Sequence, residues 1–180
     1  RILLTTADLA MLTGDLVDEY TALCARQPTT YAENLFPSAV PKASFTGPFA
    51  ACGKILMNFR GNPICHGNLL MATPALLRNE AAMARLNAVY AARKNVFTSA
   101  LSFGIGLGLA YVFGVHLFHL VTLERMAAMA SRRFGFGFVP VTFAHPEVAI
   151  DIDEAGDLVI AREVLAARAA TQSSGPRPPE

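Results

Sequence analysis

The chain has 180 residues, of which 15 are Lys or Arg and 14 are Asp or Glu, so 16% are charged. Globular domains average about 25% charged residues, whereas here hydrophobic residues reach 53% and the mean hydropathy is +0.37. This composition excludes an intrinsically disordered chain, a collagen-like repeat and a uniformly basic nucleic-acid binder, and it indicates contact with a membrane.

The small net charge of +1 conceals three regions of different sign. Residues 1–33 carry a net charge of −3, residues 34–133 carry +8 and residues 134–180 carry −4. A positive middle region beside an apolar run suits the head groups of anionic lipids. A solvated or partner-facing surface explains the same charges equally well.

An amphipathic helix is predicted over residues 6–25, within a first unit of residues 1–26. Thr5 or Thr6 can cap its start, and Arg26 followed by Pro28 marks its end. We expect it to be a peripheral helix packed on a neighbouring protein. Apolar side chains recur along it at steps of three and four residues: Leu9, Leu12, Leu16, Tyr20 and Leu23.

Residues 27–72 form a second unit that is rich in proline and glycine. Five prolines and four glycines in this stretch rule out long helices. We expect an extended segment that is held by partner proteins and not by a core of its own.

A long helix is predicted over residues 73–133. Thr73 as a cap and Pro74 at the first helical position form a good start, and no proline occurs from Ala75 to Val139. We expect one helix, or two nearly collinear ones, from about Pro74 to about Arg133.

Part of this helix is predicted to cross a membrane. The residues from Asn95 to Leu123 are 29 consecutive uncharged residues, and about 20 apolar residues are enough to span a bilayer. We place a single transmembrane span at about residues 96–121. The predicted fold class is therefore mainly α, with one membrane helix extended on both sides, a Pro-rich extended N-terminal segment and a small C-terminal hairpin.

Small residues form two ridges on nearly opposite faces of the predicted span, which suggests a helix packed between helices of other subunits. A general enrichment of glycine in membrane helices is the alternative. The first ridge consists of Ala100, Gly104 and Gly108, and the second of Ser102, Gly106, Ala110 and Gly114.

The predicted span contains no Asp, Glu, Lys or Arg, which argues against ion transport by this chain. His116 and His119 are three residues apart and share a face, so they are candidates for binding haem, a pigment or a metal. Two amphipathic rings near the membrane edge are the alternative. The basic residues near the span are expected to contact anionic phospholipid such as cardiolipin: Arg85, Arg93, Lys94, Arg125, Arg132 and Arg133.

Residues 134–180 are predicted to form a small unit outside the membrane. Phe134 to Phe143 alternates aromatic and small residues and is expected to be extended. Apolar alternation from Val148 to Ile160, around a turn at residues 153–156, suggests a hairpin. Asp157 capping a helix through Ala170 is the alternative. The tail is expected to be disordered or to lie on a neighbour.

No motif for catalysis was found. Residues 104–108 resemble a nucleotide-binding glycine pattern but follow no strand, so we discard that interpretation. The chain has three cysteines, Cys24, Cys52 and Cys65, and an odd number cannot all be paired within one chain. Cys52 and Cys65 can form one disulfide, or all three are structural thiols. The residues show no zinc-type spacing. We therefore expect neither a metal site nor an enzyme.

One stretch of the sequence is similar to a known family. Residues 94–115 resemble cytochrome c oxidase subunit VIc, which has a basic residue and Asn before one membrane helix and a Gly…Tyr-x-Phe-x-Val pattern within it. The resemblance implies a non-catalytic accessory subunit of a respiratory complex. It is carried by Lys94, Asn95, Gly106, Tyr111, Phe113 and Val115.

The function expected from these features is that of a single-pass accessory subunit. An N-terminal Arg is compatible with removal of a targeting peptide, and we expect the mitochondrial inner membrane, or a plastid membrane. There the chain would assist assembly and lipid contact in a respiratory complex or in the membrane region of ATP synthase. Its partners would be other membrane subunits and anionic lipids, with no nucleic acid and no small-molecule substrate. A haem- or pigment-binding electron-transfer subunit and a homo-oligomeric scaffold are the alternatives.

Overall fold

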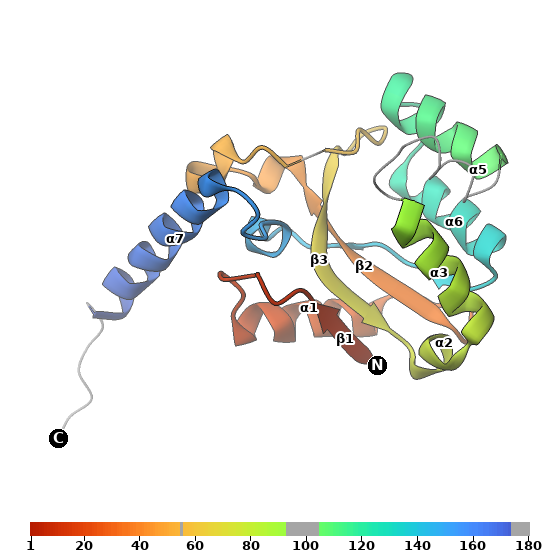
Figure 1. The fold of residues 1–180 in the computed structure, drawn as a ribbon, viewed down its shortest axis with the longest axis horizontal. Coiled ribbons are helices and arrows are strands. Elements are labelled where there is room, and N and C mark those ends of the chain that lie inside the picture. Colours follow the sequence, from red (N-terminus) through yellow and green to blue (C-terminus); the bar gives the residue numbers. More distant parts are fainter. Residues whose placement is uncertain (55, 93–104, 174–180) are drawn as a thin grey trace.

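The computed structural model describes residues 1–54, 56–92 and 105–173. They form a mixed α/β structure around a five-stranded sheet. Helices cover both faces of the two long central strands, and the C-terminal helix extends away from the sheet (Figure 1).

The sheet combines antiparallel and parallel pairs. Its main path is β1-β3-β2-β4, with β5 also paired to β2. β3 lies antiparallel to both β1 and β2, while β4 and β5 run parallel to β2. The strands are β1 (Ile2–Thr5), β2 (Asn34–Pro41), β3 (Ile64–Ala72), β4 (Gly137–Phe138) and β5 (Val141–Thr142).

The central strand β2 contains an irregularity that makes room for proline. Pro37 pairs with Leu70, but the register then shifts, so that Ala39 pairs with His66. A bulge is one of the few places where a strand tolerates proline, because proline cannot donate a ladder hydrogen bond. The bulge therefore allows a Pro-rich segment to serve as a buried strand.

Helix α1 (Gly14–Arg26) packs on one face of the sheet. The side chain of Thr13 caps its start by accepting from the Leu16 amide at 3.4 Å. Tyr20 is fully buried, and its hydroxyl donates to the Phe36 carbonyl at 2.5 Å and lies 3.2 Å from the Leu69 carbonyl. This hydroxyl joins the helix to both central strands.

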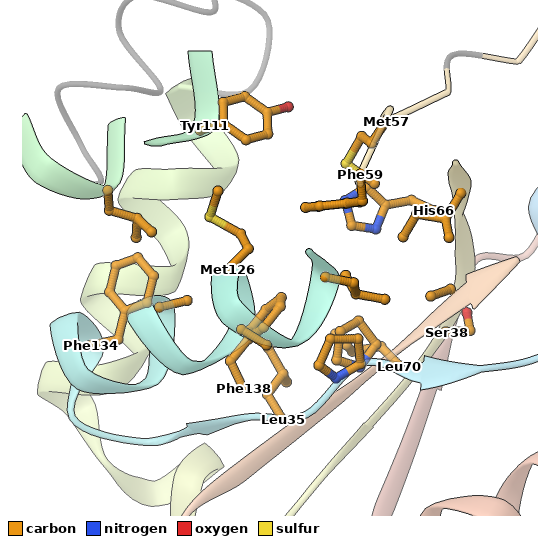
Figure 2. A pocket seen from close by; sticks show the side chains of 18 of the residues that line it. Leu35, Ser38, Met57, Phe59, His66, Leu70, Tyr111, Met126, Phe134 and Phe138 are labelled. Atoms are coloured by element: carbon orange, nitrogen blue, oxygen red, sulfur yellow. The ribbon is translucent and has the colours of Figure 1, made fainter. Parts of the chain in front are cut away.

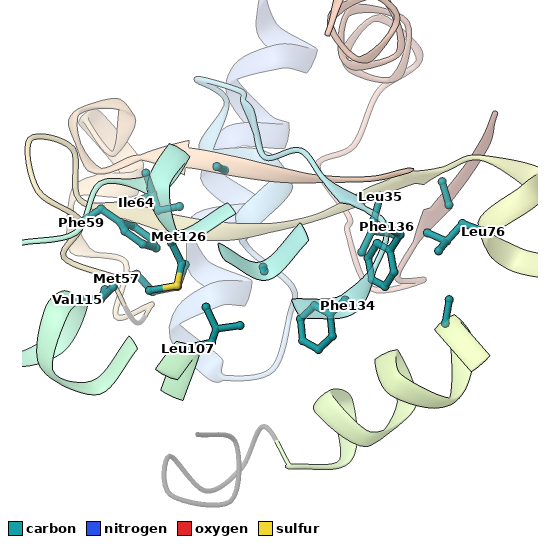
Figure 3. Close-up of a cluster of buried hydrophobic side chains, with 14 residues drawn as sticks. Leu35, Met57, Phe59, Ile64, Leu76, Leu107, Val115, Met126, Phe134 and Phe136 are labelled. Carbon is teal, nitrogen blue, oxygen red and sulfur yellow. The ribbon is translucent and has the colours of Figure 1, made fainter. Parts of the chain in front are cut away.

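The other face is covered by helices from the middle of the chain. Figure 3 shows apolar side chains of both strands meeting those of the covering helices, including Leu35, Met126 and Phe134. These helices are α2 (Pro74–Arg78), α3 (Glu80–Ala92), α5 (Ile105–Leu109), the π-helical segment η3 (Ala110–Leu117) and α6 (Leu123–Phe134).

The C-terminal helix α7 (Ala155–Ser173) is attached to the body near its start and again at Arg168. Lys54 lies 2.7 Å from Asp151 and 3.2 Å from Asp157. Further along, Arg168 donates to the Met11 carbonyl at 2.8 Å and pairs with Glu147 at 3.1 Å.

Three short 3-10 turns lie in the connections of the described residues: η1 (Lys42–Ser44), η2 (Gly47–Ala51) and η4 (Pro146–Ala149).

The predicted transmembrane helix is wrong. Among the residues that the structure describes, no helix combines the length and the apolarity that crossing a membrane requires. The second half of the predicted span forms α5 and η3 and then turns at His119, whose φ is 52°. Leu107 and Val115 from this segment are buried in the core beside the sheet. Its apolar residues therefore cover a sheet. Residues 93–104 of the predicted helix lie outside the described residues.

The mainly α fold class is wrong for two further reasons. The Pro-rich segment supplies β2 and β3, whose partners are strands of the same chain. The long helix is interrupted at Asn79 and again before Thr122, whose side chain caps α6. Thr73 and Pro74 do start a helix, as predicted, but it ends at Arg78. The absence of proline was thus not enough to keep the chain helical.

The predicted C-terminal hairpin is also wrong. Val148 lies in the turn η4, and Leu158 and Ile160 lie on α7. The carboxylate of Asp157 accepts from the Glu154 amide at 3.1 Å in the first turn of this helix. The helical alternative was therefore the better reading of these residues, because a carboxylate in the first turn satisfies amides that have no intrahelical partner.

Candidate functional site: an apolar cavity

A cavity of about 280 Å³ lies between the sheet and the helices α5, η3 and α6. Figure 2 shows side chains from both strands and from the covering helices pointing into it. Its polar lining residues among those described are Ser38, His66 and Tyr111, and none of its described lining residues is charged. The apolar ones are Leu35, Pro37, Ala39, Met57, Phe59, Ile64, Leu70, Leu86, Leu107, Leu123, Met126, Ala127, Ala130, Phe134, Phe138 and Pro140.

Strand β2 forms the floor of the cavity and sets its direction. Leu35, Pro37 and Ala39 alternate along the strand and face the helices. Leu35 pairs with Phe138 of β4, and Ala39 pairs with His66 of β3. The cavity therefore runs from a Phe138 end to a His66 end.

Helix α6 lies over this floor and runs along it. Met126, Ala127, Ala130 and Phe134 recur at helical spacing and present one face to the cavity. At the start of the helix, the Arg60 amide donates to the Val121 carbonyl at 3.0 Å, which places the Phe59 wall there. At its end, Arg85 donates to the Phe134 carbonyl at 2.6 Å, which places α3 and Leu86 there.

His66 lies at one end of the cavity and is the one exposed side chain among its described lining residues. The ring borders the open space, yet protein atoms surround that space, and this burial lowers the pKa of His66 below its ordinary value. The imidazole is therefore neutral at pH 7, with one nitrogen as donor and one as acceptor. Within the described part of the chain, the imidazole has no hydrogen-bond partner.

Ser38 borders the cavity but its hydroxyl has a structural role. The oxygen donates to the Leu69 carbonyl at 2.8 Å and accepts from the Leu69 amide at 3.2 Å, so it completes the pairing at the bulge. The space for it depends on Gly67, because a Cβ at that position would lie 2.2 Å from the Ser38 oxygen. A serine committed in this way is not a free nucleophile.

Tyr111 comes from the π-helical segment η3 and is partly buried in the upper wall. Burial raises the pKa of Tyr111, so its hydroxyl stays protonated at neutral pH. π-helical turns within helices are frequent at functional sites. The cavity is thus lined by two uncharged polar groups, an imidazole and a phenol, in an otherwise apolar wall.

Most of the predicted helix-packing residues that the structure describes are covered by the chain itself, and Gly106 is the exception. Gly114 is buried, and a Cβ there would lie 2.4 Å from a methyl group of Val121, in the turn after η3. Gly108 is buried and Ala110 partly buried, whereas Gly106 faces open space. Ala100, Ser102 and Gly104 lie outside the described residues.

The predicted lipid and cofactor residues do not gather at the cavity. Arg85 bonds to the Phe134 carbonyl, and Arg125, Arg132 and Arg133 are exposed on α6. His119 is exposed in the turn after η3. His116 belongs to η3, while Arg93 and Lys94 lie outside the described residues.

Neither the cysteines nor the acidic residues add a second centre. Cys24, Cys52 and Cys65 are free thiols, so of the two possibilities left open by the sequence the structure has no Cys52–Cys65 disulfide. Asp8, Asp151 and Asp153 each bring one carboxylate oxygen within 4.8 Å of the others. The negative charge of Asp151 raises the pKa of Asp153, and Lys54 already neutralises Asp151. Nothing else in this cluster points to an ion.

Sequence reasoning missed the cavity because it interpreted both of its walls as other structures. A signal was present in residues 123–134, where apolar residues occur at steps of three and four and basic residues occupy the opposite face. This is the pattern of a helix lying on a core. Residues 64–72 did not show regular alternation, because Gly67 and Asn68 interrupt it.

Comparisons with known proteins give one informative similarity. The chain matches no model of a protein family and no curated protein. It resembles a solved structure described as a hypothetical transferase from Thermus thermophilus, with 26% identity and a TM-score of 0.69. The similarity covers 87% of this chain and 62% of that one, so the chain spans less than two thirds of the length of its structural neighbour.

These findings overturn the membrane-subunit interpretation. A mixed α/β fold similar to a hypothetical transferase, with no spanning helix among the described residues, does not support an accessory or electron-transfer subunit in the mitochondrial inner membrane or a plastid membrane. The assignments to the respiratory chain and to oxidative phosphorylation, which depended on the membrane span, are therefore wrong as well. The same similarity weakly suggests an enzyme and does not support the expectation that the chain is not one.

Proposed function

We propose that the chain is the apolar-ligand-binding part of a group-transferring enzyme. The observation that carries this proposal is the cavity, which has about 280 Å³ of space lined by apolar side chains with only a few polar ones. Apolar cavities with a small number of placed polar groups are the usual form of a small-molecule site. The similarity to a hypothetical transferase supports group transfer as the reaction class.

His66 is the residue best suited to chemistry in this cavity. Its neutral imidazole can accept a proton from an attacking hydroxyl, amine or thiol, which is the common role of histidine as a general base. Its exposure at the end of an apolar cavity allows an acceptor to approach from solvent while the apolar part of the substrate stays buried. Tyr111 lies in the wall formed by η3, and burial keeps its hydroxyl protonated by raising its pKa.

Binding is tested with Nile red, an uncharged dye whose fluorescence rises in apolar surroundings. We expect saturable binding to the wild-type chain and at least tenfold weaker binding to Ala127→Leu, because the added carbons occupy the cavity. Ala128→Leu is the matched control, since the neighbouring residue on α6 is exposed. Equal dye binding by the two variants would refute the cavity as the site.

Transfer is tested separately with donors that carry an apolar group on a thioester or a diphosphate. Products with a mixture of alcohols, amines and thiols are detected by mass spectrometry. We expect His66→Asn to lower the rate of any transfer at least a hundredfold, because loss of a general base costs about 10² to 10⁴ in rate, and to leave the Nile red affinity within twofold.

A carrier without catalytic activity is the second candidate. It is favoured by the hydrogen bonds that occupy Ser38 and by the imidazole of His66, which lacks a partner among the described residues to orient it. Strong Nile red binding without transfer from any donor class would support this second function.

A further inference from the structure

We infer that the cavity receives one unbranched acyl chain of about ten carbons, extended along β2, with its carbonyl beside His66 and its methyl end beside Leu86 and Phe134. This inference rests on the proposed function, because it specifies the ligand of the same cavity. Three observations carry it: the length of the cavity, its cross-section and the different character of its two ends.

The length follows from the elements that form the floor and the roof. The floor runs along β2 from Leu35 to Ala39, four residues that cover about 13 Å at about 3.3 Å each. The roof runs along α6 from Leu123 to Phe134, eleven residues that cover about 16 Å. An extended hydrocarbon advances about 1.25 Å per carbon, given C–C bonds of about 1.5 Å. A chain of about ten carbons therefore matches the floor.

The volume indicates a narrow ligand. A volume of 280 Å³ spread over about 13–16 Å gives a mean cross-section of about 17–22 Å². A methylene chain that keeps about 4 Å from its neighbours needs about 16–20 Å². An apolar cavity of about 150 Å³ holds one benzene, with six carbons, so this cavity has room for about eleven. Length and volume thus agree on one extended chain.

The two ends of the cavity differ in exposure and polarity. Leu35 and Phe134 at one end are buried, whereas His66 at the other end is exposed. Figure 2 shows His66 and Phe134 at opposite sides of the space, with Met126 between them. A ligand with one polar end therefore places that end beside His66, where the imidazole N–H can donate to a carbonyl oxygen.

The lining also selects an uncharged head group. None of the described lining residues is charged, so the described lining offers a carboxylate no cationic partner, whereas the N–H of the neutral His66 imidazole can donate to an uncharged carbonyl oxygen. An ester or thioester carbonyl accepts one hydrogen bond and carries no charge. We therefore take the ligand to be an esterified acyl chain.

The inference is tested by calorimetric titration of the full chain with N-acetylcysteamine thioesters of unbranched acids with 4 to 16 carbons. These compounds are uncharged at the head. Each added carbon should tighten binding about three- to fourfold, the value expected for burying one methylene, until about ten carbons are reached. Beyond that length we expect no further gain. Affinity that rises steadily to 16 carbons, or that shows no dependence on length, would overturn the inference.

Two variants near the Phe138 end of the cavity should change, in opposite directions, the chain length beyond which affinity no longer rises; this length is the limit. Ala130→Leu should shorten the limit by two or three carbons, and Leu86→Ala should lengthen it by a similar amount. Ala128→Leu, on the exposed face of the same helix, should leave it unchanged. Circular dichroism confirms that each variant is folded. An unchanged limit in both cavity variants would place the chain elsewhere.

The orientation and the shape are tested separately. His66→Leu should weaken every thioester by about three- to tenfold, as expected for one lost hydrogen bond, without moving the limit. Tighter binding by this variant would show that the methyl end lies there. The thioester of adamantane-1-carboxylic acid, a compact group with eleven carbons, should bind at least tenfold more weakly than the undecanoyl thioester. Equal binding would contradict a narrow slot.

The outcomes separate this inference from the proposed function. If Nile red binds in the cavity and the thioesters do not, the cavity is an apolar site for another class of ligand and the inference fails alone. If Nile red binding is also absent or insensitive to Ala127→Leu, the proposed function fails as well.

Discussion

The two faces of the central strands are built from alternating residues of the same strands but are packed differently. On the face toward α1, side chains such as Phe36, Val40 and Leu69 are fully buried in a continuous cluster. On the face toward α6, Leu35 and Ala39 alternate with them and border a cavity of about 280 Å³. One strand therefore contributes to a solid core and to a hollow at the same time.

The difference shows where stability and function are separated in this molecule. A filled core maximises dispersion contacts, whereas a cavity leaves its lining with fewer of them. The α1 face is closed by Tyr20, whose hydroxyl bonds to both central strands. The α6 face contains the neutral imidazole of His66 instead. We therefore expect the first face to determine folding and the second to determine binding.

The largest predicted effect comes from comparing neighbouring leucines of β3 that point to opposite faces. Leu69→Ala removes a fully buried side chain and should lower the free energy of unfolding by about 3–5 kcal/mol. Leu70→Ala removes a partly buried side chain that already borders the cavity, and should cost about 1–2 kcal/mol. Urea denaturation of the two variants measures both values. Equal losses would mean that the two faces are packed alike.

The next effect concerns Gly67, which lies on β3 beside Ser38 at the bulge between the two central strands. Gly67→Ala places a Cβ 2.2 Å from the Ser38 oxygen and 3.1 Å from a methyl group of Val148, so we expect a loss of about 2–3 kcal/mol. Gly53→Ala is the control, because no atom lies within 4 Å of a Cβ at that exposed position. Thermal melts followed by circular dichroism suffice for this comparison. A neutral Gly67→Ala would show that the bulge adapts freely.

A smaller effect is expected at the attachment of α7. Burial alone raises the pKa of Asp151, but the hydrogen bond and charge of Lys54 outweigh it and hold the pKa of Asp151 below its ordinary value. The resulting stability is present above about pH 4 and is lost as the pH falls through the folded-state pKa. Lys54→Met should therefore lower the free energy of unfolding by about 1–2 kcal/mol at pH 7 and by progressively less below pH 4, as urea titrations at each pH will show. Lys42→Met is the control, and it should change the free energy of unfolding little because Lys42 is exposed.

The smallest effect is a pH dependence that belongs to the cavity face. Burial lowers the pKa of His66, so as the pH falls through about 6.5 the unfolded chain takes up a proton before the folded one. This contribution to stability is present above that pH and is lost below it. His66→Gln should therefore lose less stability than the wild type between pH 7 and pH 5, in urea titrations at each pH. Parallel losses would show that the imidazole is fully hydrated.

Local features of the sequence determined several elements by themselves. Helix α2 starts at Thr73 and Pro74 because a proline, which has no amide proton, suits the first turn, although the Thr73 hydroxyl accepts from the Asn34 amide and does not cap the helix. The apolar spacing around Leu16 and Tyr20 determined the buried face of α1, although the helix begins at Gly14. These features depend on contacts within a few residues, which a sequence displays directly.

Tertiary structure alone decided the use of the apolar run in its described part, residues 105–117. A stretch of uncharged residues is equally suited to lipid and to the cover of a sheet, because both surroundings are apolar. The presence of β2 and β3 decided between these two environments. The sequence did not indicate the two strands, because proline and glycine interrupt the pattern of a strand in both. The bulge that admits Pro37, and the cavity above it, arise from pairings between residues about 30 positions apart. Such long-range contacts follow from the whole fold and not from any local pattern.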